Sequence, residues 1–235
     1  MTVQPRAIFF DMDGTILDWR TGMEERWAWA CKTHCDGSYA PADLLVAVRR
    51  RRDWFWEDTE RQQTGRLDLD EASREIVRLA FADLGLGPVE LAHRIANDYR
   101  ASRAESIKPY PGALETLAAV RARGIRTALL TNGGADAQRE SVERHGLTAF
   151  FDCVLIEGEF GVGKPDERIF RHALRELEGD PESTWMVGDS LEADIAPALA
   201  LGMHAVWVDV EGEGLPEDAP VRPQRVVRGI HELLF

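Results

Sequence analysis

Residues 9–19 read FFDMDGTILDW and place two aspartates directly after an apolar run. The run RAIFF (6–10) is typical of a buried strand, so Asp11 and Asp13 are predicted at its carboxyl end. A carboxylate leaving water there is costly unless something compensates its charge. Asp and Gly also favour simple turns, so the stretch by itself fits either a strand end or a site. The rest of the chain distinguishes the two.

From about residue 105 onward, strand-like apolar runs alternate with helix-like segments. This alternation predicts an α/β fold with a Rossmann-like parallel sheet core, which RAIFF joins, and helices on both faces. A polar loop is expected over 211–224. The predicted strands are 124–132, 151–158, 184–189 and 203–209, and the predicted helices are 112–123, 135–146, 166–179 and 191–202.

The segment between the first strand and residue 105 has helical patterns and no convincing strand. We therefore expect an inserted four-helix cap over 16–105, with residues 1–15 and 106–235 forming the catalytic core. Two prolines in IKPYPG (107–112) suit a return hinge, because proline is incompatible with a helix interior. The expected cap helices are 24–35, 42–58, 69–85 and 90–105.

The composition and net charge of the chain argue against some classes of function. The chain has 235 residues and a net charge of −13, which argues against a nucleic-acid polymer as partner. No run approaches the ~18 apolar residues of a membrane helix, and the N-terminus lacks a secretory pattern. A cytoplasmic enzyme without a membrane partner is expected, and its oligomeric state cannot be read from the sequence. An anionic ligand would need a local lysine, arginine or metal ion.

Polar side chains follow each predicted core strand. The second strand ends at Thr131-Asn132-Gly133, Lys164 follows the third, and the fourth leads into Asp189, Ser190 and Asp194. The carboxyl ends of parallel strands meet at one edge of a sheet, where ligands bind. Polar residues after a single strand would be weak evidence. Because these residues and Asp11 and Asp13 are all predicted at the same edge, the sequence predicts a ligand-binding site there.

This set of side chains suits phosphoryl transfer through an aspartyl intermediate. Asp11 can attack phosphorus, and Asp13 can protonate the leaving group and later deprotonate water. Mg²⁺ would relieve the repulsion between the carboxylates, with Asp189 as a further ligand. Positive charge would come from Lys164. The Thr131 hydroxyl and the amides of Asn132 and Gly133 can bind phosphate oxygens.

The same residues resemble the motifs of the haloacid dehalogenase-like (HAD) hydrolase superfamily, in its phosphatase branch with a helical cap. DMDGT resembles the first motif, TNG the second, GKP the third and GDSLEAD the fourth. The segments 131–147 and 160–174 look like the nucleotidase and N-acylneuraminate-9-phosphatase subgroup. The resemblance implies an Asp11 nucleophile, an Asp13 acid/base, and Mg²⁺ held by Asp11, the backbone carbonyl of Asp13, and Asp189.

The resemblance implies a Mg²⁺-dependent phosphomonoester hydrolase acting on a small phosphorylated metabolite, such as a nucleoside monophosphate, a sugar phosphate or a sugar-acid phosphate. Dehalogenases of this fold lack the second aspartate, so Asp13 argues for a phosphoester. A phosphomutase with the same catalytic set remains an alternative. So does a catalytically silent protein that binds a phosphorylated ligand. Specificity would lie in cap side chains, which leaves the substrate open.

Several candidates have structural alternatives. Ser190 can be a helix N-cap, and Asp194 can position Lys164 instead of binding metal. GEFGVGK (158–164) matches the start of a P-loop, but Pro165 stands where a Ser or Thr should hold Mg²⁺. Cys31, His34 and Cys35 could share a helix face, and ordinary packing is favoured over a metal site there.

Aromatic and basic residues of the cap are specificity candidates. The run RRRRDWFW (49–56) cannot put its four arginines on one face, since they span about 300° of a helix. Solvated arginines beside core aromatics are favoured over substrate contacts. The same choice between packing and substrate binding applies to Trp19, Arg20, Trp27, Trp54 and Trp56.

Overall fold

The computed structural model describes residues 4–35 and 37–233. The chain divides into two compact units, one formed by Met1–Asp18 with Lys108–Phe235 and the other by Trp19–Ile107. The division falls slightly later than 15/16 and 105/106 because β2 (Leu17–Asp18) and β3 (Lys108–Pro109) pair antiparallel at the crossing points. The backbone N–H of Tyr110 also donates to Ile16 O at 2.8 Å. Both chain crossings are thus tied to the first unit.

The first unit contains a six-stranded sheet in the order β5-β4-β1-β6-β7-β8, with every ladder parallel. The predicted parallel sheet is therefore confirmed. An additional edge strand, β8, directly follows the expected loop and has only three residues. The strands are β1 (Ala7–Phe10), β4 (Arg126–Thr131), β5 (Cys153–Ile156), β6 (Thr184–Gly188), β7 (His204–Val208) and β8 (Arg225–Val227).

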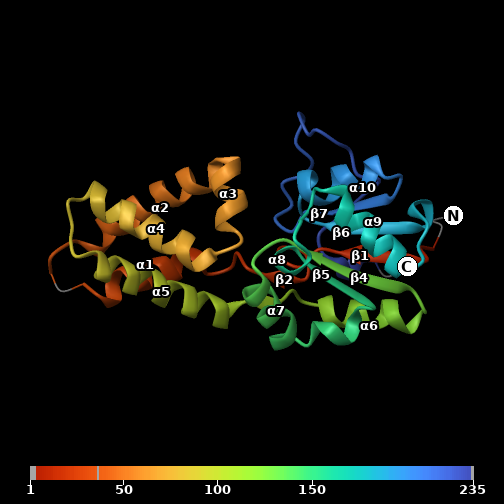
Figure 1. Cartoon of the computed structure of the whole chain (residues 1–235), viewed down its shortest axis with the longest axis horizontal. Coiled ribbons are helices and arrows are strands. Elements are labelled where there is room, and N and C mark those ends of the chain that lie inside the picture. Colours follow the sequence, from red (N-terminus) through yellow and green to blue (C-terminus); the bar gives the residue numbers. More distant parts are fainter. Residues whose placement is uncertain (1–3, 36, 234–235) are drawn as a thin grey trace. The chain divides into compact units, whose positions relative to one another are not determined.

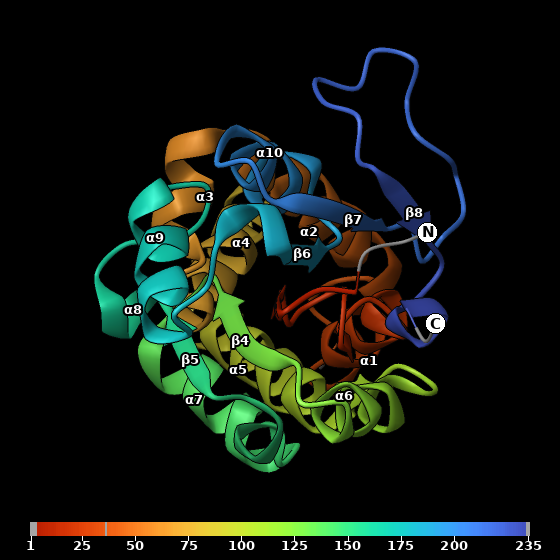
Figure 2. The ribbon, with the colours of Figure 1, turned by 90° about the vertical axis from the view of Figure 1, so that its right-hand side faces the viewer.

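Strand β1 lies at the centre of the sheet, between β4 and β6. Its side chains alternate between the two faces. Phe9 packs with Ala128 and Met186 beneath helix α9 (Glu167–Glu176), whereas the ring of Phe10 contacts Phe151 edge-on at 6.1 Å. Helices α6 (Ala113–Ala122) and α7 (Ala135–Arg144) cover the face opposite α9 and α10 (Ala196–Ala200) (Figures 1 and 2). The strand is buried on both sides, which explains its unbroken apolar sequence.

The helix expected over 191–202 is interrupted. Leu191–Ile195 forms a π-helical turn and α10 covers only Ala196–Ala200. Pro197 has no backbone N–H, so a regular α-helical hydrogen bond back to Ala193 cannot form. A short helix, α8 (Glu157–Phe160), follows β5 and was not predicted.

The second unit contains the four expected helices and one more. They are α1 (Met23–Thr33), α2 (Pro41–Glu57), α4 (Leu69–Asp83) and α5 (Val89–Ser106). The addition is α3 (Thr59–Gly65), so the expectation of four helices was incomplete. Asp58 starts α3 as an N-cap, since its side chain accepts the Arg61 N–H at 2.9 Å. The extra helix therefore lies between the predicted helices 42–58 and 69–85.

Trp27 lies in the core of the helical unit. It is 1% exposed, and its ring stacks on Tyr99 with centroids 3.5 Å apart. Trp29, two residues along the same helix, is 48% exposed. The two tryptophans therefore mark the inner and outer faces of α1.

The four consecutive arginines of α2 are ion-paired on two sides of the helix. Arg49 and Arg52 both contact Glu24 of α1, while Arg50 and Arg51 both contact Asp83 of α4. Two salt-bridged pairs at a largely exposed surface contribute little stability each. The prediction that the four cannot share one face is confirmed, and their contacts are within the helical unit.

The Cys31–Cys35 segment packs as an ordinary helix end. Burial raises the pKa of the Cys31 thiol to about 12, and Cys35 Sγ lies 3.2 Å from Tyr39 O. His34 pairs with Asp98 at 2.7 Å. Among the described residues, these side chains form no metal-binding cluster.

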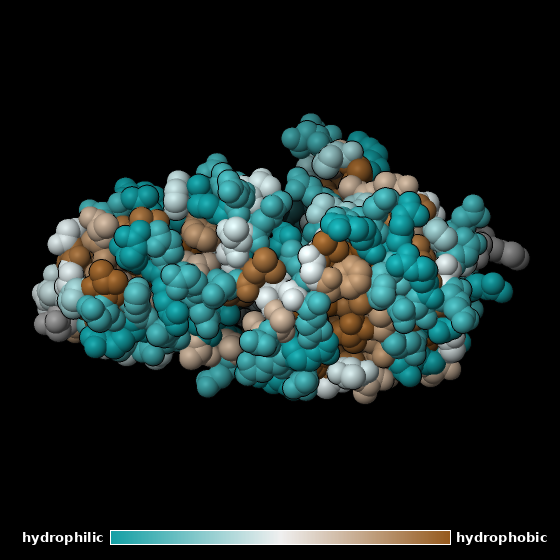
Figure 3. All heavy atoms as spheres, in the orientation of Figure 1, coloured by the Kyte–Doolittle hydropathy of each residue, from teal (hydrophilic) through white to brown (hydrophobic). Residues whose placement is uncertain are grey.

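Hydrophilic side chains cover most of the face seen in Figure 3, with small apolar areas between them. None of the described helices combines the length and apolarity needed to cross a membrane.

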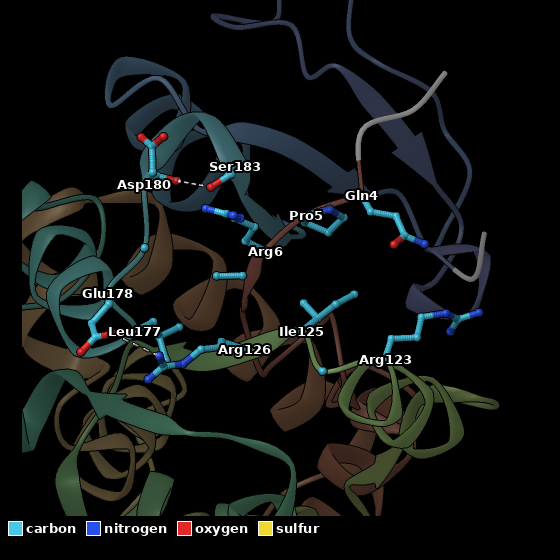
Figure 4. A pocket seen from close by; sticks show the side chains of 13 residues that line it. Gln4, Pro5, Arg6, Arg123, Ile125, Arg126, Leu177, Glu178, Asp180 and Ser183 are labelled. Atoms are coloured by element: carbon cyan, nitrogen blue, oxygen red, sulfur yellow. Dashed lines mark hydrogen bonds and ion pairs between the residues drawn. The ribbon is translucent and has the colours of Figure 1, made fainter.

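A pocket of about 390 Å³ opens at the amino ends of β1 and β4, lined by Arg6, Arg123 and Arg126 among others (Figure 4). Arg126 lies 3.8 Å from the exposed Glu178. This pocket is at the opposite end of the strands from the predicted site.

The packing of the helical core can be tested by comparing the buried Trp27 with the exposed Trp29 of α1. Trp27→Ala should lower the free energy of unfolding by about 3–5 kcal/mol, because it leaves a cavity against Tyr99. Trp29→Ala, the matched control, should change it by less than about 1 kcal/mol. Urea unfolding followed by circular dichroism measures both. Equal effects of the two substitutions would contradict the packing described for α1.

Candidate active site

Asp11 stands at the carboxyl end of the central strand. Its backbone N–H donates to Val187 O at 2.9 Å, which continues the β1–β6 ladder by one residue. The residue is 6% exposed. The chain then turns tightly, since Met12 O accepts from both Ile16 and Leu17 N–H at 2.9 Å. The pleated strand therefore fixes Asp11, and the turn sends Asp13 in a new direction.

Lys164 is buried between two carboxylates. Its Nζ lies 2.7 Å from Asp11 Oδ1 and 2.6 Å from Asp194 Oδ1, and its side chain is 2% exposed. The three residues come from the end of β1, the loop after α8 and the π-helical turn after β6. The fold thus joins three of the residues that the sequence predicted to converge.

Burial and charge oppose each other in this triad. Burial by itself would lower the pKa of Lys164, but the charges of Asp11 and Asp194 outweigh it and hold that pKa above its usual range. Burial raises the pKa of Asp194 to about 6, against the opposing pull of Lys164 and with repulsion from Asp11 adding to the rise. One ammonium shared by two buried carboxylates thus leaves excess negative charge in the triad.

Asp194 is held on both oxygens. Besides the Lys164 contact at Oδ1, its Oδ2 accepts the Ser190 N–H at 3.1 Å. A Cβ added to Gly188 would lie 2.3 Å from Asp194 Oδ2, so a glycine is required there. Ser190 caps the turn by accepting the Ala193 N–H at 3.0 Å. These contacts favour the structural roles considered for Ser190 and Asp194, with Asp194 positioning Lys164.

The backbone of Lys164 is fixed by Asn132. The Asn132 side chain accepts the Lys164 N–H and donates to the Lys164 carbonyl, both at 2.7 Å. A Cβ on Gly163 would lie 2.6 Å from Asn132 Oδ1, so this close approach needs a glycine. The Asn132 side chain therefore holds the backbone of the loop that contains Lys164. The predicted role of its backbone amide in phosphate binding stays a prediction.

The amide of Gly133 has a partner that the sequence analysis missed. Glu157, buried at the end of β5, accepts the Gly133 N–H at 2.9 Å. The predicted use of this amide for phosphate would require that hydrogen bond to be given up. Glu157 was missed because the predicted strand 151–158 runs past the end of β5 at Ile156 and includes it. Thr131 lies at the end of β4 and is 1% exposed.

Asp13 is held by a second residue that the sequence analysis missed. Gln138, in the first turns of α7, donates from Nε2 to Asp13 Oδ2 at 3.0 Å and to Asn132 O at 2.9 Å. Asp11 and Asp13 thus have different side-chain partners, Lys164 and Gln138, and both of these partners hydrogen-bond to Asn132. Gln138 was not predicted because the helix around it reads as an ordinary amphipathic segment.

The acidic side chains fit a divalent cation. Carboxylate oxygens of Asp11, Asp189 and Asp194 all lie within 4.8 Å of one another. Asp11 Oδ2 is buried and has no hydrogen-bond partner among the described residues. Carboxylate oxygens are the ligands that Mg²⁺ prefers, and a buried acceptor without a partner is costly. The indole N–H of Trp207 fixes the Asp189 carbonyl at 2.8 Å.

The five specificity candidates all lie in the helical unit. Trp27 is a core residue, which favours packing over substrate contact, and Trp56 packs against the same core. Trp54 is 40% exposed, and the Arg61 guanidinium stacks 3.7 Å over its ring. Trp19 has Arg20 and Arg103 at 5.3 and 5.2 Å from its ring. A substrate contact by Trp19, Arg20 or Trp54 stays a prediction.

A Rossmann-like sheet with a buried lysine–carboxylate cluster at its carboxyl edge, where parallel sheets bind ligands, defines the class as an α/β enzyme. The haloacid dehalogenase-like hydrolase family matches residues 5–202. The chain therefore belongs to this family, as the motifs predicted.

Known proteins similar to this chain include two phosphatases. Phosphoserine phosphatase of Thermus thermophilus is 42% identical over 161 residues, covering 68% of this chain and 63% of that protein. N-acylneuraminate-9-phosphatase of Mus musculus is 28% identical over 250 residues, covering 97% and 92%. The matches to the first curated relatives span about half to two thirds of their length.

The HAD-hydrolase YfnB from Bacillus subtilis, solved bound to magnesium, has a TM-score of 0.76 to this chain at 21% identity. The alignment covers 98% of this chain and 97% of that one. At this level of identity the likeness supports the fold. It extends over both the α/β core and the helical segment.

The Lys164 triad predicts a specific pattern of stability. Lys164→Met should lower the free energy of unfolding by about 3–5 kcal/mol, because it leaves Asp11 and Asp194 buried without their cation. Adding Asp194→Asn should restore part of that loss by removing one unpaired charge. Denaturant unfolding at neutral pH without divalent metal measures both variants. A double variant less stable than Lys164→Met would contradict the charge balance proposed for the triad.

Proposed function

We propose that the chain is a Mg²⁺-dependent phosphomonoester hydrolase that works through an aspartyl-phosphate on Asp11. The main support for the proposal is the set of contacts made by the two oxygens of the Asp11 carboxylate. One oxygen is held by the Lys164 ammonium, and the other is buried without a hydrogen-bond donor among the described residues. A carboxylate so held at a strand end is oriented to attack an electrophile.

In the first step a carboxylate oxygen of Asp11 attacks phosphorus, and the bond from phosphorus to the ester oxygen breaks. Asp13, as the carboxylic acid, gives its proton to the departing oxygen, so that an alcohol leaves instead of an alkoxide. Lys164 keeps the nucleophile in place and offsets charge on the phosphoryl oxygens. The products of this step are the alcohol and the aspartyl-phosphate.

In the second step Asp13, now a carboxylate, takes a proton from water as that water attacks phosphorus. The bond between phosphorus and the Asp11 oxygen breaks, inorganic phosphate leaves, and Asp13 is again protonated. Both residues return to their starting states. The presence of Asp13 as well as Asp11 favours this phosphoester chemistry over dehalogenation.

The charge of the site supports a metal requirement. Asp11, Asp13, Asp189 and Asp194 oppose a single ammonium, Lys164, which gives this set a net charge of −3 when all are ionised. A phosphate ester, itself an anion, would be repelled from such a set. Asp11 and Asp189, with the Asp13 carbonyl, would hold Mg²⁺. The bound ion would supply charge neutralisation and orientation of the phosphoryl group.

The substrate class is a small phosphorylated metabolite. The similar proteins named above support this class, since their names specify phosphoserine and an acylneuraminate 9-phosphate as what they act on. They differ from each other in substrate, so neither name is transferred to this chain. A cytoplasmic location stays a prediction.

Purified protein should hydrolyse p-nitrophenyl phosphate or a metabolite phosphate with Mg²⁺ and lose that activity in excess EDTA. Asp11→Asn should lower kcat by more than about 10³-fold, because it removes the nucleophile. Asp136→Asn is the matched control, since Asp136 is an exposed aspartate of the same unit. Phosphate release is the measurement.

Failure of the wild-type protein on a broad panel of phosphate esters with Mg²⁺ would overturn the hydrolase proposal. Nearly full activity of Asp11→Asn would overturn the nucleophile assignment. Isomerisation of a sugar phosphate faster than its hydrolysis would identify a mutase instead. Tight binding of an ester without turnover would identify a binding protein.

A further inference from the structure

We propose that Gln138 is a positioning residue that holds Asp13 in the orientation needed for proton transfer. The inference rests on the proposed hydrolase function and deepens it. Gln138 is only 7% exposed, although glutamine is usually a surface residue. Its Nε2 bridges Asp13 Oδ2 at 3.0 Å and Asn132 O at 2.9 Å. The amide thus ties the predicted acid/base to the loop that follows β4.

The orientation of the Gln138 amide is fixed by chemistry. Both of its partners on this side, a carboxylate oxygen and a backbone carbonyl, are acceptors. Only the NH₂ end of the amide can face two acceptors, and each of its two hydrogens has one. A flipped amide would set its carbonyl oxygen against two other oxygens. The Gln138 amide therefore presents its NH₂ end, as a hydrogen-bond donor, to the Asp13 carboxyl group.

The approach of Gln138 depends on a neighbouring glycine. A Cβ on Gly133 would lie 2.7 Å from Gln138 Nε2, and the φ of Gly133 is +134°, which side-chain-bearing residues rarely adopt. The N-terminal part of α7 begins directly after this turn, with Gln138 N–H donating to Gly134 O at 3.1 Å. The loop after β4 and the start of α7 therefore form the support for Asp13.

The function of this support follows from what Asp13 does. Asp13 follows the turn at Met12 and is only partly buried, so packing alone does not fix its carboxyl group. A general acid must have its proton directed at the leaving oxygen. An error of about 1 Å in such placement can cost up to about 10²-fold in rate. Holding one carboxyl oxygen removes most of the rotation that would produce this error.

The test uses leaving groups that differ in their need for a proton. Gln138→Met keeps the side-chain length and volume but cannot donate. It should slow the single-turnover release of alcohol from an alkyl phosphate by about 10- to 100-fold. Release of p-nitrophenol, a good leaving group, should slow by less than about 3-fold. The ratio of the two rates on one preparation does not depend on how much of the protein is folded.

A double-mutant cycle shows whether Gln138 acts through Asp13. In an Asp13→Ala background, with enzyme in excess over alkyl ester, adding Gln138→Met should change the rate by less than about 2-fold. Arg139→Met is the control on the same helix, because Arg139 is partly exposed and pairs with Glu159. It should leave both rates unchanged. Gln138→Asn, which keeps the amide but shortens its reach, replaces Gln138→Met if that variant does not fold.

Three outcomes would overturn the proposal while the hydrolase function stands. They are equal slowing of both esters, unchanged rates in Gln138→Met, or the same loss with and without Asp13. If the wild-type protein hydrolyses neither ester, the hydrolase function itself has failed. The two failures are therefore distinguishable in one set of assays.

Discussion

The site depends on one ammonium group buried between two carboxylates. Lys164 Nζ lies 2.7 Å from Asp11 and 2.6 Å from Asp194, and these three side chains come from three different segments of the core unit. Removing such charges from water costs several kcal/mol per ion, so a buried ion pair is poor evidence for stability. The Lys164–Asp11 ion pair matters here because it fixes the orientation of the Asp11 carboxylate. Gly163 and Gly188 are needed because Asn132 and Asp194 approach them closely.

The two aspartates of DMDGT have different side-chain partners. Asp11 is joined to Lys164 in the buried interior, and Asp13 is joined to Gln138 at the start of α7. Different partners would let one carboxylate serve as nucleophile while the other exchanges a proton, since each role needs a different environment. The tight turn at Met12 produces this difference in partners within two residues. The proposed division of labour between the aspartates therefore has a physical basis in the local backbone.

The core was predictable because its signals are local. β1, β4, β5, β6 and β7 are apolar runs, and polar residues at their ends mark one edge of the sheet. β8, with three residues, and α3, with a cap at Asp58, were too short to give a periodic pattern. Glu157 and Gln138 were missed because their partners, Gly133 and Asp13, are distant in sequence. Gln138 and Asp13 are 125 residues apart, and only the folded sheet brings them together. Trp27 was ambiguous because a buried and a substrate-binding tryptophan have the same sequence signature.

The central claim is a covalent bond between phosphorus and Asp11, and its direct test is to trap that bond. Turnover of a phosphate ester would be quenched in acid, and peptides of the digested protein analysed by mass spectrometry. The account predicts one phosphoryl group on the peptide that contains Asp11, at the aspartate carboxyl, and none on the same peptide from Asp11→Asn. A phosphoryl group on another residue, or rapid hydrolysis without any labelled peptide and with Asp11→Asn active, would contradict it.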